Sequence, residues 1–194
     1  VIDHVRGDLD AQGGDYESKR EGIYAQIDYQ MHALTKMTMG LQWNKAQGHS
    51  ETSPRLALIR RLNTNWTVKL WYAEAFRSPY GSELFFEASY LQGDENLLPE
   101  RIKTTEAQFL YARSDLSFAG TYYHSKTSEI IGREVVNGVN TFVNLLGSVE
   151  SDGVEFEANW KINSNWRIQG NYSYQLNENE SGIEDVMGAS RAMA

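Results

Sequence analysis

The chain has 194 residues, a formal net charge of −8 and no cysteine. The lack of cysteine excludes disulfides, thiolate metal sites and a cysteine nucleophile. The acidic balance is a poor match for nonspecific binding to nucleic acid. Hydrophobic residues make up 41% of the sequence and aromatic residues 12%, which excludes a disordered tail. No 18 apolar residues run together, so a membrane-spanning helix is also excluded.

Apolar and polar residues alternate along most of the chain, a pattern typical of strands with one face in each environment. The alternation is clearest in residues 153–161, where Val154 and Phe156 oppose Glu155 and Glu157. No segment keeps a period of 3.6 over three turns. In chain order, the expected strands are 20–31, 36–46, 54–62, 66–76, 101–112, 115–126, 141–162 and 165–176. The sequence therefore predicts an all-β chain with eight strands.

The links between these strands alternate in length. Short links are expected at 32–35, 63–65, 113–114 and 163–164, and long links at 46–53, 77–100 and 127–140. Antiparallel neighbours need only a tight turn, so the long loops must all emerge at the opposite end of the sheet. Most of the strands exceed the five or six residues common in soluble sheets. Their length suits tilted strands that cross a bilayer.

Tryptophan follows a short Asn-rich turn twice, at Trp66 and Trp166. An amphipathic ring at that level suits the boundary between membrane and water, although the same residues could pack on a soluble core. Alternation alone does not say which face is wet, because a sandwich turns its apolar face inward and a membrane barrel turns it outward. In a barrel, the polar set would line the lumen; its candidates are Gln42, Asn44, Glu155, Glu157, Asn159, Gln169 and Asn171.

Several segments carry a resemblance to a known family. The stretch 72–85 reads Tyr-Ala-Glu-Ala-Phe-Arg-Ser-Pro-Tyr-Gly-Ser-Glu-Leu-Phe. It resembles a segment of TonB-dependent outer-membrane receptors, in which a strand leads into Gly/Ala-Phe-Arg-Ala-Pro and then Glu-Leu-Phe/Tyr. Residues 93–100 are similar to the family's Gly-Asn-Pro-x-Leu-x-Pro-Glu, except that Leu97-Leu98 follows Asn96. Further matches, at 21–26, 53–58 and 143–157, follow in the family's order.

The resemblance implies an antiparallel up-and-down transmembrane β-barrel of about 22 strands, of which this chain would supply eight. Residues 1–194 would belong to a single barrel domain, with the N-terminal plug domain and the C-terminal closing strands outside this sequence. Turns would face the periplasm and long loops the exterior. The barrel would lie in the outer membrane of a Gram-negative bacterium.

The resemblance also implies a function. Such receptors bind a scarce large solute, commonly a ferric siderophore, and admit it with energy that the TonB complex passes to the plug. The implied partners are outer-membrane lipid, the plug, the TonB complex and the solute. Binding and gated passage need no catalytic residue and no cofactor, so the chain is not expected to be an enzyme.

The loop 77–100 is the best candidate for contact with the solute. It combines a fixed cation with aromatic surface, which suits a large chelate or macrocycle. The candidate residues are Arg77, Tyr80, Phe85, Phe86 and Tyr90. Arg77, together with Phe76 and Pro79, fits better a role in shaping the exit from strand to loop, because these three are the recurring part of the resemblance.

Other patterns point to structure. Glu155 and Glu157 lie on one strand, whereas a glycosidase pair must flank a bond from opposite sides. The four histidines show no ligand spacing, so no metal site is expected. Residues 135–139 read as a tight Asn-Gly hairpin within a loop. The acidic ends, at 3–21 and 178–185, read as solvated loop material.

Two other functions fit the same alternation. The first is a soluble carbohydrate-binding β-sandwich or barrel that would use Trp71, Tyr123 or Phe86 as stacking platforms. Simple sequential hairpins argue against a sandwich, which uses Greek-key connections. The second is a passive porin, which would lack a plug.

Overall fold

The computed structural model describes residues 2–8, 15–46 and 49–179. Nearly all of them lie in strands. The elements are β1 (Ile2–Asp8), β2 (Asp15–His32), β3 (Thr35–Ala46), β4 (His49–Arg61), β5 (Trp66–Arg77), α1 (Gly81–Phe85), β6 (Leu91–Gln92), β7 (Glu100–Ala112), β8 (Leu116–Ser128), β9 (Ile131–Val136), β10 (Val139–Asn144), β11 (Ser148–Lys161) and β12 (Arg167–Asn179). Within these ranges, no helix has the length and apolar character needed to span a membrane.

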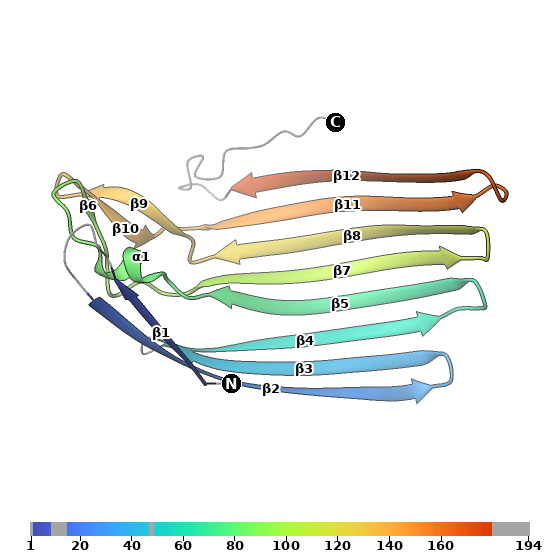
Figure 1. The fold of residues 1–194 in the computed structure, drawn as a ribbon, viewed down its shortest axis with the longest axis horizontal. Coiled ribbons are helices and arrows are strands. Elements are labelled where there is room, and N and C mark those ends of the chain that lie inside the picture. The colour runs from blue at the N-terminus through green and yellow to red at the C-terminus, as the bar shows by residue number, and fades with distance from the viewer. Residues whose placement is uncertain (1, 9–14, 47–48, 180–194) are drawn as a thin grey trace.

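Nine strands form one sheet in the order β1-β2-β3-β4-β5-β7-β8-β11-β12. Every neighbouring pair is antiparallel. The sheet therefore follows the chain as a series of hairpins, as the sequence predicts, with β1 added to the eight expected strands. Short turns lie at one end of the sheet, and α1, β6, β9 and β10 gather at the other (Figure 1). We call these the turn end and the loop end.

Two of the predicted strands differ from those in the structure. β4 begins at His49, so the expected long link 46–53 is short. The expected strand 141–162 is two strands, β10 and β11, because the chain turns at 145–147, where Gly147 has a φ of 101°. The long loops are therefore 78–99 and 129–147. The second loop contains the predicted hairpin, with φ of 52° at Asn137 and 85° at Gly138.

The acidic ends also differ from the expected loops. Residues 2–8 and 15–21 pair as β1 and the first part of β2. At the other end, Glu178 still lies in β12. Residues 180–185 fall outside the part of the chain that the structure describes.

Cross-strand register separates an apolar from a polar face. One row across β5, β7, β8, β11 and β12 consists of Leu70, Ala107, Tyr122, Val154 and Tyr174. These residues share a face because partners in register point to the same side of a sheet. Large side chains on this face are exposed, with Phe156 at 54% and Ile168 at 53%.

The adjacent row, which lies on the opposite face, is Lys69, Gln108, Thr121, Glu155 and Ser173. A few apolar residues also lie on the polar face and interrupt the alternation in the sequence. Leu110 is one of them, because its partners in register are Thr67 and Ala119.

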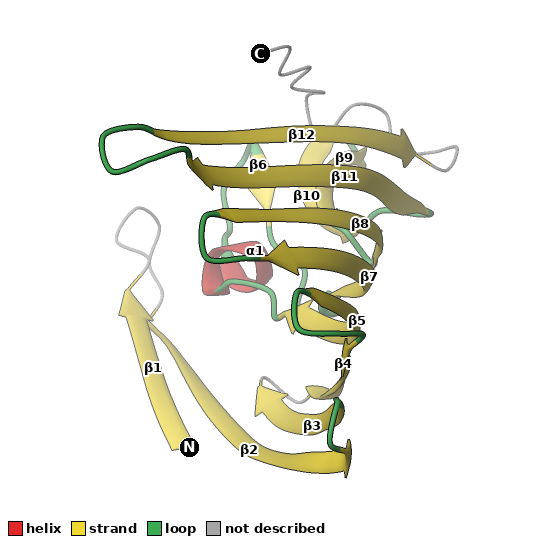
Figure 2. Ribbon diagram, turned by 90° about the vertical axis from the view of Figure 1, so that its right-hand side faces the viewer, coloured by secondary structure: helices red, strands yellow, loops and turns green. Residues whose placement is uncertain are grey.

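The sheet is bent into an arc that does not close (Figure 2). Among the described residues, β12 pairs only with β11, and residues 22–32 of β2 pair only with β3. Both edges therefore carry unpaired backbone groups, which a strand in lipid cannot leave unsatisfied. The arc is a wall segment of a larger barrel.

The buried apolar clusters of the described residues lie in and beside the loops. One consists of Ile130, Leu145 and Val149, and the other of Leu84, Leu97 and Ile131. The loop end therefore has a core of its own, while the sheet has two open faces.

Candidate functional site

The exit from β5 into loop 78–99 is organised by Arg77. Its Nε donates to Glu100 Oε2 at 2.7 Å, and its Nη1 donates to Glu83 Oε2 at 2.9 Å. Arg77 and Glu100 are partners in register, while Glu83 lies on α1. Glu83 also accepts the backbone N–H of Tyr80 at 2.7 Å. One guanidinium thus joins two strand ends to the helix, as the strand-exit interpretation of Arg77 predicts.

Charge pairing sets the ionisation of this site, which lies at the loop end, beyond the exposed apolar rows. Burial alone would raise the pKa of Glu100, but hydrogen bonds from Arg77 and from the backbone N–H of Ile131 outweigh it and hold the pKa below its ordinary value. The Glu100 hydrogen bond also raises the pKa of Arg77. Both groups are therefore charged at neutral pH.

The structure brings the predicted ligand residues together only in part. The Arg77 guanidinium lies 4.9 Å from the centre of the Tyr80 ring. Tyr80 is 58% exposed, Phe85 40% and Tyr90 66%. Phe86 is half-buried and follows α1. Tyr80 therefore offers an accessible ring beside a cation that already has two carboxylate partners.

Loop 129–147 adds residues that the sequence patterns did not single out. Arg133 on β9 is opposite Phe142 on β10, and its guanidinium lies 5.9 Å from the ring centre. Asn144, at the end of β10, hydrogen-bonds to the backbone of loop 78–99. The hairpin motif predicted the turn between β9 and β10, but no sequence signal places these side chains beside a loop that lies about 46 residues earlier.

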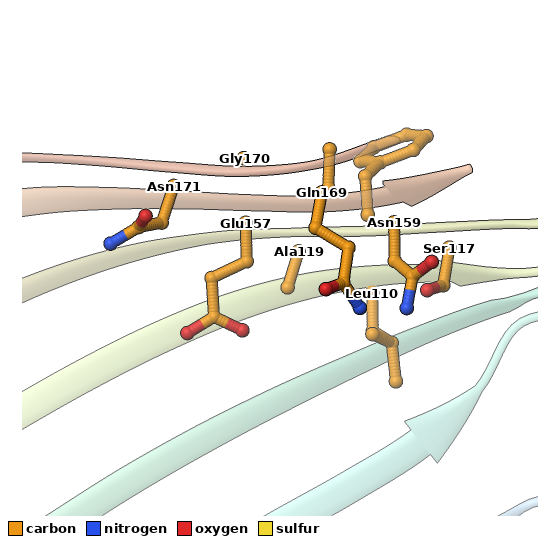
Figure 3. Close-up of a pocket in the computed structure, with 10 residues that line it drawn as sticks. Leu110, Ser117, Ala119, Glu157, Asn159, Gln169, Gly170 and Asn171 are labelled. Carbon is orange, nitrogen blue, oxygen red and sulfur yellow. The ribbon is translucent and has the colours of Figure 1, made fainter. Parts of the chain in front are cut away.

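The seven predicted lumen residues share the polar face. Gln42 and Asn44 lie two residues apart on β3, while Asn159 is opposite Gln169, and Glu157 opposite Asn171. A hollow of about 420 Å³ is lined by Leu110, Ser117, Phe118, Ala119, Glu157, Ala158, Asn159, Gln169, Gly170 and Asn171. Figure 3 shows Glu157, Asn159 and Gln169 projecting from the same side of their strands.

A second hollow on this face, of about 270 Å³, is lined by Thr104, Glu106, Thr121, Tyr123, Ser125 and Glu155. Both hollows open on the polar face. The Arg77 side chain, on the same face, is bonded to Glu83 on α1, so loop 78–99 folds over this face. Figure 2 shows α1 inside the arc, and the polar face is therefore the concave side.

Some polar groups of this wall lack a protein partner among the described residues. Glu155 and Glu157 form no ion pair with any other residue that the structure describes. Asn44 Nδ2 is buried without a hydrogen-bond partner in the same set of residues. Such groups need water or a polar partner on the concave side.

Aromatic rings gather at the turn end of the apolar face. Trp66 lies 5.0 Å from Tyr111 and 5.4 Å from Phe118, between ring centres. The turns before Trp66 and Trp166 are built alike, with Asn63 Oδ1 and Asn163 Oδ1 each accepting two backbone N–H groups. Each Asn-rich turn therefore places a tryptophan at or directly before the start of a strand, at the turn end of the sheet.

Metal chemistry gains no support from this arrangement. Across the described ranges, no group of three or more His, Asp or Glu side chains is placed to hold an ion.

Comparison with known proteins gives a consistent result. A family model described as "TonB dependent receptor-like, beta-barrel" matches residues 3–192. A comparison with curated proteins gave no significant match.

Three solved structures illustrate the structural likeness. The siderophore receptor PirA from Pseudomonas aeruginosa has a TM-score of 0.77 at 21% identity, with 84% of this chain and 32% of that chain covered. The FrpB iron transporter from Neisseria meningitidis has a TM-score of 0.72 at 18% identity, with coverage of 86% and 27%. A variant of the ferric enterobactin receptor PfeA from Pseudomonas aeruginosa has a TM-score of 0.76 at 18% identity, with coverage of 86% and 28%.

At such identities the structures establish a shared fold, and this chain spans under a third of each. The family model establishes membership of the family, because it matches nearly the whole sequence. That family consists of receptors and transporters rather than enzymes. The chain therefore belongs to the TonB-dependent receptor family and is a segment of its β-barrel.

Proposed function

We propose that this chain forms part of the wall and the outer loops of an outer-membrane receptor that takes up a scarce large solute, such as a ferric siderophore, by TonB-coupled transport. The turn end would face the periplasm of a Gram-negative bacterium, and the loop end the exterior. The chain would belong to a single barrel domain, and the plug and closing strands would come from other parts of the protein.

The observation that carries this proposal is the two-faced sheet. Its convex face is apolar and exposed, and its concave face is polar and hollowed. This is the arrangement of a membrane barrel, whose outer face meets lipid and whose lumen is polar. Solved proteins that share the fold are a siderophore receptor and an iron transporter.

The concave wall suits a plug domain as its partner. Glu155, Glu157 and the amide of Asn44 face the space that a plug would fill. Glu155 and Glu157 are exposed in this segment, and a plug that covered them would bury their charges. Because buried charges without partners are costly, we propose that polar groups of the plug meet them. The other proposed lumen residues are Gln42, Asn159, Gln169 and Asn171.

The aromatic residues of loop 78–99 are the proposed contacts with the solute. Tyr80, Phe85, Phe86 and Tyr90 would stack against a large chelate, and Arg77 would hold the Tyr80 ring in place. TonB would act through the plug rather than through this segment.

The alternatives are less well supported. A sandwich would cover its apolar face with a second sheet, whereas the described apolar face is open and its strands pair in sequential order. A passive porin would share this wall, but its transport would not depend on energy.

The test expresses the complete receptor in a Gram-negative bacterial strain that lacks its own siderophore receptors. Uptake of radioactive iron would be measured with a tricatecholate and with a trihydroxamate chelate, with and without TonB and a protonophore. The proposal predicts saturable uptake of at least one chelate that disappears without TonB. Uptake that is equal with and without TonB would identify a passive pore instead.

A further inference from the structure

We propose that loops 78–99 and 129–147 fold and move as one body, the loop cap, and that Asn144 is the positioning residue that locks them together. Three independent kinds of contact join the two loops: backbone pairing, apolar packing and side-chain hydrogen bonds. Their combination distinguishes the loop cap from two loops that merely lie side by side.

Backbone pairing comes first. β6, in loop 78–99, pairs in parallel with β10, in loop 129–147, where Leu91 is opposite Asn140 and Gln92 opposite Thr141. One loop thus supplies the third strand of the sheet β6-β10-β9. Either loop without the other leaves an open strand edge.

Apolar packing crosses the same boundary. Leu84 and Leu97, from loop 78–99, are 6% and 1% exposed and form a cluster with Ile131, from loop 129–147. Phe142 on β10 packs against this cluster. Separating the loops would expose these apolar side chains to water, which the hydrophobic effect opposes.

The side chain of Asn144 makes three hydrogen bonds, two to loop 78–99 and one within its own loop. Its Oδ1 accepts the Leu98 N–H at 2.8 Å, and its Nδ2 donates to the carbonyl oxygens of Leu98 at 3.0 Å and Glu129 at 2.8 Å. The pair of bonds to Leu98 imitates a β-ladder between loops. No aliphatic residue at position 144 could make these contacts.

The loop cap is also fixed to the barrel wall. Glu100 accepts the N–H of Ile131 at 2.9 Å while it holds Arg77. Loop 129–147 is thereby tied to the ends of β5 and β7, which are not its own strands. Because each loop is held by the other, motion of loop 78–99 must carry loop 129–147 with it.

This inference does not depend on which solute is transported or on TonB, so it can fail or succeed independently of the proposed function. The experiment uses the complete receptor in bilayers, on a cysteine-free background. Spin labels at Ser82→Cys on α1 and Val135→Cys on β9 report the distance between the loops by double electron–electron resonance. Both positions are exposed.

The proposal predicts a single narrow distance distribution, which broadens in Asn144→Ala. The matched control is Asn96→Ala, because Asn96 bonds only to Asp94 in its own loop, with Nδ2 at 2.9 Å from Asp94 Oδ1. This variant should keep the narrow distribution. A broad distribution in the unmodified receptor, or a narrow one in Asn144→Ala, would overturn the proposal.

Hydrogen exchange gives a second test that needs no substitution, in case Asn144→Ala fails to fold. If the loops open together, amides of Leu98 in one loop and Thr141 in the other should exchange with the same opening free energy. Clearly different values would show that the loops open separately, and would overturn the proposal.

Discussion

The ring of Tyr123 on β8 lies over Gly153 on β11, in the space that a side chain at position 153 would occupy. A Cβ atom at 153 would stand 2.2 Å from Tyr123 Cζ. The two residues are partners in register, and the Tyr123 hydroxyl reaches beyond the glycine to donate to Gln175 Oε1 on β12 at 2.8 Å. A missing side chain on one strand thus allows a hydrogen bond that spans three strands of the polar face.

Gly153→Ala should therefore destabilise the barrel, because the Tyr123 ring must move and lose its contact with Gln175. We expect a loss of about 1–3 kcal/mol in the free energy of unfolding, as for an overpacked site. The measurement is denaturant unfolding of the complete receptor in lipid.

Gly170→Ala is the control for this prediction, since a Cβ at 170 meets nothing within 4 Å among the described atoms. Equal losses in the two variants would mean that strand flexibility, and not the Tyr123 ring, explains the effect.

Phe156→Arg should impair insertion, because Phe156 lies near the middle of β11 on the apolar face and is 54% exposed. An arginine that faces the bilayer midplane costs about 2–4 kcal/mol. Gln169→Arg, on the polar face, should have a much smaller effect. The folding yield of each variant in lipid vesicles is the measurement. A larger loss of yield in Gln169→Arg than in Phe156→Arg would place lipid on the polar face.

The faces of the sheet were predictable from the sequence because a strand places every second residue on the same side. The assignment of Val154 and Phe156 to one face, and of Glu155 and Glu157 to the other, followed directly from this alternation. The exact ends of strands were less predictable. Residues 141–162 read as one strand because apolar residues continue through Leu145 and Leu146, whereas the break depends on the left-handed conformation of Gly147.

The loop cap was less predictable than the sheet. The motif around Arg77 marked the exit from β5, and Asn137-Gly138 marked the hairpin. The contacts of Asn144 with Leu98 join residues far apart in the chain, and a single asparagine in an apolar-polar strand carries no signal of its distant partner. Such contacts follow from how the strand ends meet, which local patterns do not encode.

Acidification should loosen the loop cap. The pKa of Glu100 is lowered in the folded state, so its contribution to stability is present above its ordinary pKa and is lost as pH falls through the lowered value. A spin label at Glu95→Cys, an exposed position, should therefore become more mobile as the pH falls below the ordinary titration range of a glutamate.

Glu100→Gln tests this assignment at the residue itself. In this variant, the spin label at position 95 should be more mobile at neutral pH, because the ion pair with Arg77 is gone. For the same reason, the mobility of the label should change less on acidification. An unaltered acid transition in Glu100→Gln would assign the transition to other carboxylates.

Glu157→Gln should weaken the fit between wall and plug if the unpaired carboxylate meets a cationic group there. We expect more frequent or larger ion conductance of the complete receptor in planar bilayers. Glu134→Gln, an exposed position on the outer hairpin, is the control and should leave conductance unchanged. Equal conductance in both variants would argue against a plug contact at Glu157.

The most direct test of the account is the direction of the two faces in the complete receptor. Spin labels placed singly at positions 154 to 161 in bilayers would be exposed to oxygen, which concentrates in lipid, and to a water-soluble nickel complex. The account predicts that positions 154, 156, 158 and 160 respond to oxygen, and that positions 155, 157 and 159 respond to the nickel complex or to neither. The opposite alternation, or no alternation, would contradict the barrel segment and the receptor function proposed from it.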